Sequence, residues 1–206
     1  MTSYDYQEAL KNAAKSMVRV KNPRRLLKMI VRFIVREVGL SHASILMYDQ
    51  MKSRYIFVDS KGHDRIPINL VKLDEQNPLI RWFSEKDLKL RLQKDLLTID
   101  GIHNWLSDST LFNYEKAETL RNWLNQLADT MKMLKATVCV PGYYKNELLG
   151  VLILGDKVNG KPFSSEELSF FQTLANDASM TIKTAKYQED LLSKNLQLEK
   201  QKKCLL

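Results

Sequence analysis

The chain has 206 residues, of which 44% are hydrophobic and 27% are charged. This composition is typical of a folded globular protein and excludes a disordered or fibrous one, and two cysteines are too few for a disulfide framework. The formal charge of +8 raises the question of an anionic partner, but residues 1–40 carry nine Lys or Arg and only three Asp or Glu. The basic excess therefore belongs mainly to one end of the chain.

No stretch of the sequence has the length of a membrane span or the pattern of a secretory signal. The first residues are polar, and the best apolar stretches fall far short of the roughly 20 residues that a bilayer requires. Two cysteines, Cys139 and Cys204, fit a reducing compartment. We therefore expect a cytoplasmic protein.

Two amphipathic helices are predicted before the first strand. Apolar residues spaced by three and four between Tyr6 and Val20 predict the first helix. Asn22 and Pro23 suit the N-cap and the first turn of the second helix, and Gly39 is placed to end it in a left-handed conformation.

The next part of the sequence changes to short apolar runs, which predict strands. Residues 45–48 and 55–58 indicate two neighbouring antiparallel strands, and residues 65–70 an edge strand that contains Pro67. A short helix is predicted over 77–83.

Residues 88–92 suggest one more strand, and residues 94–113 are predicted to form a long loop with a helical turn at Trp105. An amphipathic helix is predicted from Glu115 to Leu134.

The strongest strand candidates are residues 136–141 and 148–155, which we expect to form a hairpin. Their nearly continuous hydrophobicity predicts central strands that are covered on both faces. Ser164 and Glu167 have the spacing of a capping box, and the apolar pattern beyond them predicts one helix to the C-terminus.

The second half of the chain resembles the GAF domain family. The matching phrases are an apolar strand ending in Pro141, Leu-Gly-Val-Leu at 149–152, Phe-Ser-Ser-Glu-Glu at 163–167 and a small-residue-rich helix from Leu174. The resemblance implies a layered α/β (α+β) fold, with a mostly antiparallel sheet flanked by helices and long N- and C-terminal helices. It divides the chain into a dimerisation helix at 1–22, a GAF-like domain at 23–187 and a coiled-coil extension at 188–206.

The resemblance also implies a function in signal transduction of the bacterial sensory type. The helices of the two ends would cover one face of the sheet, and residues 60–134 would cover the other and form the ligand pocket in members that have one. We expect a small-molecule-sensing or regulatory module that dimerises through its terminal helices and controls an output domain outside these residues, such as a kinase, cyclase or transcription regulator. The alternative is a ligand-free dimerisation scaffold whose pocket is filled by side chains.

Two sets of residues are the candidate sites. Polar and aromatic residues of the variable half are candidates for a ligand pocket: Arg81, Trp82, Asp95, His103, Trp105 and Tyr114. Apolar residues of the terminal helices are candidates for the dimer interface: Leu10, Ala13, Met17, Phe171, Ala178, Ile182, Ala185, Leu192 and Leu196.

Each ligand class known in the family requires particular residues. Some members bind cyclic nucleotides through an Asn-Lys, Phe, Asp-Glu signature, from which Asp156-Lys157, Phe163 and Glu166-Glu167 depart in identity and spacing, so we expect these residues to be structural. Bilin attachment is disfavoured because Cys139 lies in a strand and Cys204 in the tail.

No enzyme activity is expected. Two separated thiols cannot supply the chemistry of the methionine sulfoxide reductase branch, and no nucleophile, base and orienting group occur together. His42, His63 and His103 lack metal-ligand spacing, so a metal is disfavoured too.

The basic N-terminal region has three interpretations: the solvated face of a dimerising helix, a membrane-surface segment, or a phosphate-contacting surface. No nucleic-acid-binding motif accompanies it, and no nucleic-acid partner is expected.

Overall fold

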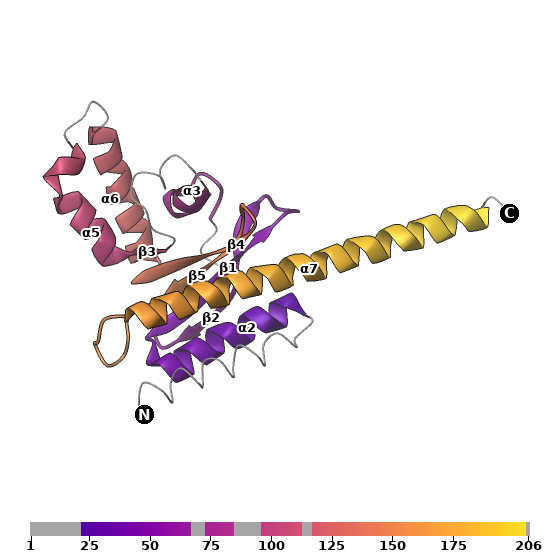
Figure 1. Ribbon diagram of the computed structural model, residues 1–206, viewed down its shortest axis with the longest axis horizontal. Helices are drawn as coiled ribbons and strands as arrows, with labels where there is room; N and C mark the ends of the chain where they lie inside the picture. Colours follow the sequence, from indigo (N-terminus) through magenta and orange to yellow (C-terminus); the bar gives the residue numbers. More distant parts are fainter. Residues whose placement is uncertain (1–21, 67–72, 85–95, 113–116, 205–206) are drawn as a thin grey trace.

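A five-stranded antiparallel sheet lies between two layers of helices (Figure 1). The computed structural model describes residues 22–66, 73–84, 96–112 and 117–204. The strands are β1 (His42–Asp49), β2 (Arg54–Gly62), β3 (Leu97–Thr98), β4 (Val138–Tyr144) and β5 (Glu147–Leu154), in the order β2-β1-β5-β4-β3. All four strand pairs are antiparallel, as the sequence predicts.

The central strand β5 is buried on both faces. Every residue from Leu148 to Leu154 is buried, and the side chains alternate between two hydrophobic clusters. Leu152 and Leu154 belong to one cluster, and Val151 and Ile153 belong to the other. This confirms the prediction that the hairpin lies inside the sheet with helices on both sides.

One face of the sheet is covered by α2 (Pro23–Phe33), the π-helical turn η1 (Ile34–Gly39) and α7 (Ser165–Cys204). The start of α2 is capped as predicted, because the Asn22 side chain accepts a hydrogen bond from the Arg25 backbone N–H at 3.0 Å. Gly39 has a φ of 72°, which is the left-handed conformation expected at the end of this helical segment.

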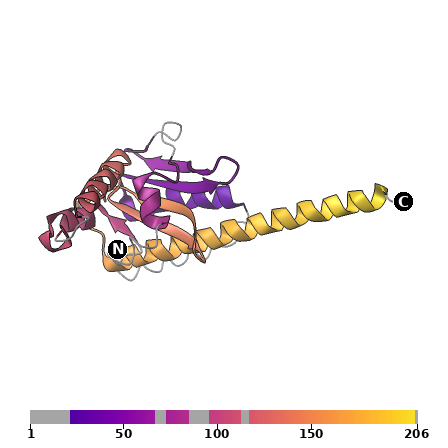
Figure 2. The same cartoon turned by 90° about the horizontal axis from the view of Figure 1, so that it is seen from above.

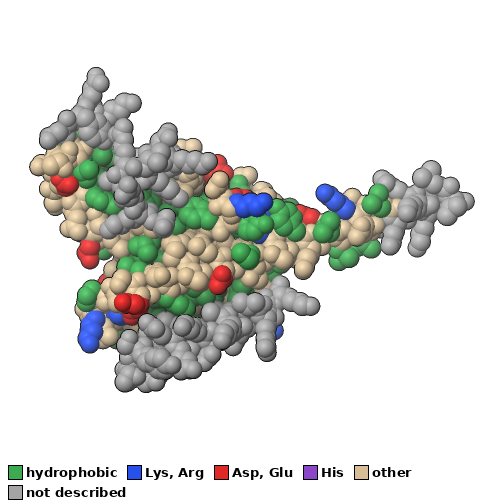
Figure 3. Space-filling model, in the orientation of Figure 1, with side chains coloured by type: hydrophobic (Ala, Val, Ile, Leu, Met, Phe, Trp, Pro, Cys, Tyr) green, Lys and Arg blue, Asp and Glu red, His purple; other side chains and the backbone are tan. Residues whose placement is uncertain are grey.

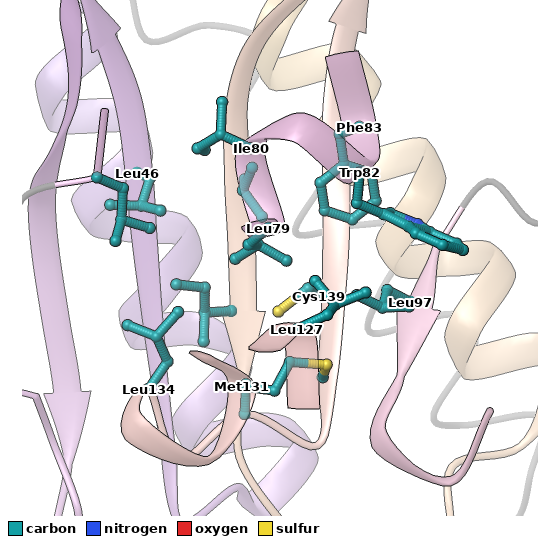
Figure 4. Packing of buried hydrophobic residues seen from close by; sticks show 14 of the residues in the cluster. Leu46, Leu79, Ile80, Trp82, Phe83, Leu97, Leu127, Met131, Leu134 and Cys139 are labelled. Carbon is teal, nitrogen blue, oxygen red and sulfur yellow. The ribbon is translucent and has the colours of Figure 1, made fainter. Parts of the chain in front are cut away.

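The other face carries α3 (Pro78–Ser84), α5 (Ile99–Ser107), the 3₁₀ helix η2 (Ser109–Phe112) and α6 (Ala117–Met133). Figure 4 shows the α3 side chains Leu79, Trp82 and Phe83 gathered with Leu127 and Met131 of α6 over the sheet. The assignment of residues 60–134 to this face is thus confirmed for the part of it that the structure describes.

The loop predicted over residues 94–113 is wrong in its centre, where α5 and η2 form. Thr98 caps α5, since its hydroxyl accepts from the Gly101 backbone N–H at 3.0 Å, and Ile102 is buried. Asp100 and Gly101 resemble a turn in sequence, but they occupy the first helical turn, where an acidic residue is favourable.

The hairpin turn is also tighter than the predicted connector over 142–147. Strand β4 continues to Tyr144, and only Lys145 and Asn146 lie between the strands, with Lys145 at a φ of 56°. Other predicted elements lie wholly or partly outside the described residues: the helix over 6–20 and the strands over 65–70 and 88–92.

Helix α7 projects far beyond the sheet (Figures 1 and 2). Its 40 residues span about 60 Å. The first half packs on β4, most closely at Gly142, where a Cβ atom would overlap the Ser179 hydroxyl oxygen and would lie 2.9 Å from the Ala175 carbonyl oxygen. None of the described helices is long and apolar enough to cross a membrane.

Candidate functional site

A stack of three tryptophans fills part of the face where the sequence predicts a ligand pocket. Trp82 of α3 lies between Trp105 of α5 and Trp123 of α6, with ring centroids 5.2 and 5.3 Å apart and interplanar angles of 28° and 20°. Trp82 has no solvent-exposed surface, and Phe83 beside it is also buried. The stack joins three helices that come from distant parts of the chain.

The tryptophan stack is apolar and contains no group that titrates near neutral pH. The indole N–H groups of Trp82 and Trp123 are buried and have no hydrogen-bond partner among the residues that the structure describes. The side chains therefore occupy the space between α3, α5 and α6, and the arrangement suits packing rather than proton transfer or nucleophilic attack.

The structure brings together only part of the predicted ligand site. Trp82 and Trp105 are in contact, whereas His103 is exposed on α5 and Arg81 lines a separate surface hollow. Asp95 and Tyr114 lie outside the described residues. The prediction missed Trp123, although its position one residue before the buried Leu124 in the apolar pattern of α6 could have indicated it.

The hollow beside Arg81 has a volume of about 490 Å³ and lies between α3, the β1–β2 hairpin and the start of β5. The Tyr48 hydroxyl donates to Glu75 at 3.2 Å, and the Tyr55 hydroxyl donates to the Leu148 carbonyl at 3.0 Å. Burial raises the pKa of Tyr55, so its hydroxyl stays a neutral donor. With one guanidinium and carboxylates at its rim, the hollow can hydrogen-bond a small polar molecule.

Three of the residues that correspond to the cyclic-nucleotide signature, Lys157, Phe163 and Glu167, lie together, with the Lys157 ammonium 5.6 Å from the centroid of the Phe163 ring. The Lys157 ammonium lies 2.8 Å from the Glu167 carboxylate, and both side chains are about nine-tenths buried. Glu167 also accepts from the Ser164 backbone N–H at 2.8 Å, while the Ser164 hydroxyl accepts from the Glu167 N–H at 3.2 Å. The predicted capping box is therefore present, and Phe163 packs edge-on against Phe171 at 6.0 Å.

The predicted dimer residues of α7 do not form one free face. Phe171 and Ala178 are buried in the core of their own chain, and Ile182 and Ala185 are half-buried. Leu192 and Leu196 are exposed beyond the sheet, and Leu10, Ala13 and Met17 lie outside the described residues.

A second apolar stripe runs along the opposite side of α7. Its members are Met180, Tyr187, Leu191 and Leu198, each at least 50% exposed. They share a seven-residue repeat, and at 100° per residue they lie about 180° from Ala178 and Ile182. Figure 3 shows hydrophobic side chains at the surface of this projecting helix. This stripe can be found in the sequence, but the stripe through Phe171 has the more regular apolar spacing and is therefore the one that the sequence pattern favours.

Two further titratable groups, His42 and Cys139, lie in the interior. His42 is fully buried at the start of β1, and burial lowers its pKa, while burial raises the pKa of the Cys139 thiol in β4. No group of three or more His, Cys, Asp or Glu in the described part of the chain could hold a metal ion.

Comparison with protein-family models matches residues 22–182 to the GAF domain. A comparison with curated protein sequences finds no match. Among solved structures, the GAF domain of an Acinetobacter phosphoenolpyruvate-protein phosphotransferase is 17% identical, with a TM-score of 0.60 over 91% of this chain and 97% of that one.

Two further solved structures have the same fold. Residues 122 to 287 of a methyl-accepting chemotaxis protein are 15% identical, with a TM-score of 0.59 over 85% of this chain and 98% of that one. A free methionine-R-sulfoxide reductase from Neisseria meningitidis, solved with its substrate, is 9% identical, with a TM-score of 0.55 over 89% of this chain and 91% of that one. Similarity at these identities concerns the fold alone.

Proposed function

The chain belongs to the GAF domain family, and from that premise we propose that it is a cytoplasmic regulatory module that relays a state through paired α7 helices. Its homologues include sensory and regulatory modules of signalling proteins. In this proposal two copies pair along α7, and a ligand or partner that changes their packing repositions an output domain beyond α7. The observation that carries it is α7 itself, which begins in the core and projects past it.

The proposed interface is the stripe of Met180, Tyr187, Leu191 and Leu198. This stripe is exposed both beside the sheet and beyond it. The stripe through Phe171, in contrast, is buried in the core of the domain as far as Ala178. A repeat of seven residues favours a left-handed coiled coil. Two copies could therefore pair continuously from Met180 to the end of the described helix.

Sedimentation equilibrium tests this pairing. We expect a dimer at micromolar concentration, and a monomer for the double variant Leu191→Glu/Leu198→Glu, because it places charges in an apolar seam. The matched control Leu192→Glu/Leu196→Glu carries the same charge change on the other stripe and stays a dimer. A native monomer contradicts the relay, and dissociation of the control alone moves the interface to the Phe171 stripe.

A ligand-free scaffold is the second candidate, and the tryptophan stack favours it because side chains fill the space between α3, α5 and α6 on the ligand-side face. The hollow beside Arg81 favours sensing instead. A thermal-shift screen with small anionic metabolites separates the two. For a sensor, at least one compound raises Tm in the native chain and fails to do so in Arg81→Gln; for a scaffold, no compound raises Tm.

A further inference from the structure

The outer side of α2 carries a dense array of cations. We call it the basic face and define it by Arg24, Arg25, Lys28 and Arg32 of α2 with Arg36 of η1, all of which are exposed. The opposite side of the same helix is apolar and buried, with Leu26, Leu27, Ile30, Val31 and Ile34 in the core. The basic face is thus held on a helix that cannot turn without unpacking the domain.

The spacing of the cations makes a nearly straight row. Arg24, Lys28, Arg32 and Arg36 follow one another at intervals of four residues, so each lies about 6 Å further along the axis. Arg25 lies beside this row. Helix α2 lies along the sheet next to α7 (Figure 1), and the four side chains of the row are exposed on its outer side.

The basic face has almost no neutralising partner in the described part of the chain. Helix α2 contains no Asp or Glu, and the only ion pair found for these five residues joins Arg36 to Glu37 at 3.9 Å, between exposed side chains. Like charges four residues apart on a helix repel one another. The array therefore carries a net attraction for an external anion.

We propose that the basic face binds the anionic surface of a lipid bilayer, with α2 parallel to the membrane plane. Each Lys or Arg near such a surface adds to the attraction, so the charges of the row act together. Met29, 37% exposed beside the cations, places one flexible apolar side chain at the same surface. The sequence adds Lys11, Lys15, Arg19 and Lys21 directly before this helix.

A planar partner fits the basic face better than a nucleic acid does. Duplex recognition uses an element that enters a groove, and single strands stack on exposed aromatic rings. Helix α2 lies flat against the sheet and cannot enter a groove, and its only aromatic residue, Phe33, packs partly against the core. A flat bilayer can contact the whole row at once.

Vesicle co-sedimentation of the full chain tests the proposal. We expect binding to phosphatidylcholine vesicles with about 30% phosphatidylglycerol and none to pure phosphatidylcholine, with binding that weakens as salt is added. Neutralising the face in Arg24→Gln/Arg25→Gln/Lys28→Gln/Arg32→Gln lowers the partition coefficient by about 100-fold or more.

Two matched variants test whether the loss of binding is due to the charge of the basic face. Lys132→Gln/Lys145→Gln/Lys161→Gln/Lys194→Gln removes the same charge from exposed sites elsewhere and loses much less binding, and Arg24→Lys/Arg25→Lys/Arg32→Lys keeps the charge and keeps the binding. Circular dichroism checks that each variant is folded. The proposal is overturned if the native chain ignores anionic vesicles, or if both neutralised variants lose binding equally. Tighter binding to duplex DNA through the same four residues also overturns it.

Discussion

The indole of Trp82 is packed on both of its faces, so its removal leaves a space that the neighbouring rings cannot fill without moving their helices. We expect Trp82→Ala to lower the free energy of unfolding by about 3–5 kcal/mol, the usual cost for a buried tryptophan. Urea unfolding followed by circular dichroism measures it. Trp105→Ala serves as the control and costs less, because Trp105 is only half-buried. A loss below about 1 kcal/mol for Trp82→Ala contradicts the structural role of the stack.

His42 makes the stability of the domain depend on pH. Its imidazole is fully buried at the start of β1, and a Cβ on Gly155 would overlap Nδ1. Burial is the main cause of the lowered pKa and Lys135 acts in the same direction, whereas a backbone hydrogen bond with Leu134 and the charges of Asp64 and Asp156 oppose it.

The direction of the pH effect follows from the two states. The unfolded chain binds a proton at His42 near the ordinary histidine pKa of 6.5, whereas the folded chain binds one only at lower pH. The free energy of unfolding therefore falls as the pH is lowered through 6.5 toward the folded pKa, by at most about 1.4 kcal/mol per pH unit. We expect His42→Leu to remove this slope. His103→Gln, at an exposed site, should leave it in place, and an unchanged slope in His42→Leu would assign the effect to another group.

The first turn of α7 depends on one carboxylate with two partners. Glu167 accepts from the Ser164 N–H and pairs with Lys157, and both charged side chains are largely buried. We expect Glu167→Ala to cost about 3 kcal/mol or more, because it leaves the buried ammonium unpaired, and Ser164→Ala to cost about 1 kcal/mol. Thermal and urea unfolding measure both.

A variant series separates the charge of Glu167 from its role as a cap. Glu167→Gln can still accept from the Ser164 N–H but loses the ion pair, so its midpoint should fall between those of the native chain and Glu167→Ala. Glu166→Gln, next to it on the exposed side, keeps the ion pair and should lower the midpoint much less than Glu167→Gln does, because it removes only a favourable charge from the helix N-terminus. If Glu167→Gln is as stable as the native chain, the ion pair with Lys157 contributes nothing.

The sequence correctly predicts those elements for which the local helix-end signals and the packing of the whole domain favour the same structure. Asn22-Pro23, Gly39 and the Ser164–Glu167 spacing mark helix ends by local hydrogen bonding and backbone conformation, and the structure has each of them. Helix α5 was missed because Asp100-Gly101 is equally suited to a turn and to a first helical turn. Only the burial of Ile102 against the rest of the core decides between them, and that is a tertiary effect.

The two sides of α7 illustrate the same limit for the candidate site. Spacing alone identifies an apolar stripe, but it does not say whether the domain or another chain covers it. Phe171 and Ala178 are buried in the core of the domain, and only the structure shows that Met180 and Tyr187 are exposed. The tryptophan stack is similar, because Trp82, Trp105 and Trp123 come together only through the packing of three helices.

At the scale of the whole molecule, the projecting part of α7 should affect association and not stability. The sheet covers α7 as far as Ala185, and Leu191 to Leu198 contact nothing else in the described chain. We expect a chain that stops after Tyr187 to unfold at nearly the same urea concentration as the full chain when both are monomeric. Under the proposed pairing it is also a monomer at concentrations where the full chain is a dimer, which light scattering measures. If truncation after Tyr187 lowers the urea midpoint of the monomer strongly, the projecting part of α7 contributes to stability and the prediction is wrong.

The close approach of Gly142 to α7 limits how the helix can move. The β4 backbone lies so near Ala175 and Ser179 that a turn of the helix about its own axis would drive Ser179 or its neighbours into the strand. This contact opposes rotation of the helix about its axis, so we expect the helix and the hairpin to move together, as a tilt. From Ser179 to Cys204 the arm is about 37 Å long, so a tilt of about 5° moves the far end by about 3 Å. A displacement too small to disturb the core is thus enlarged at the tip.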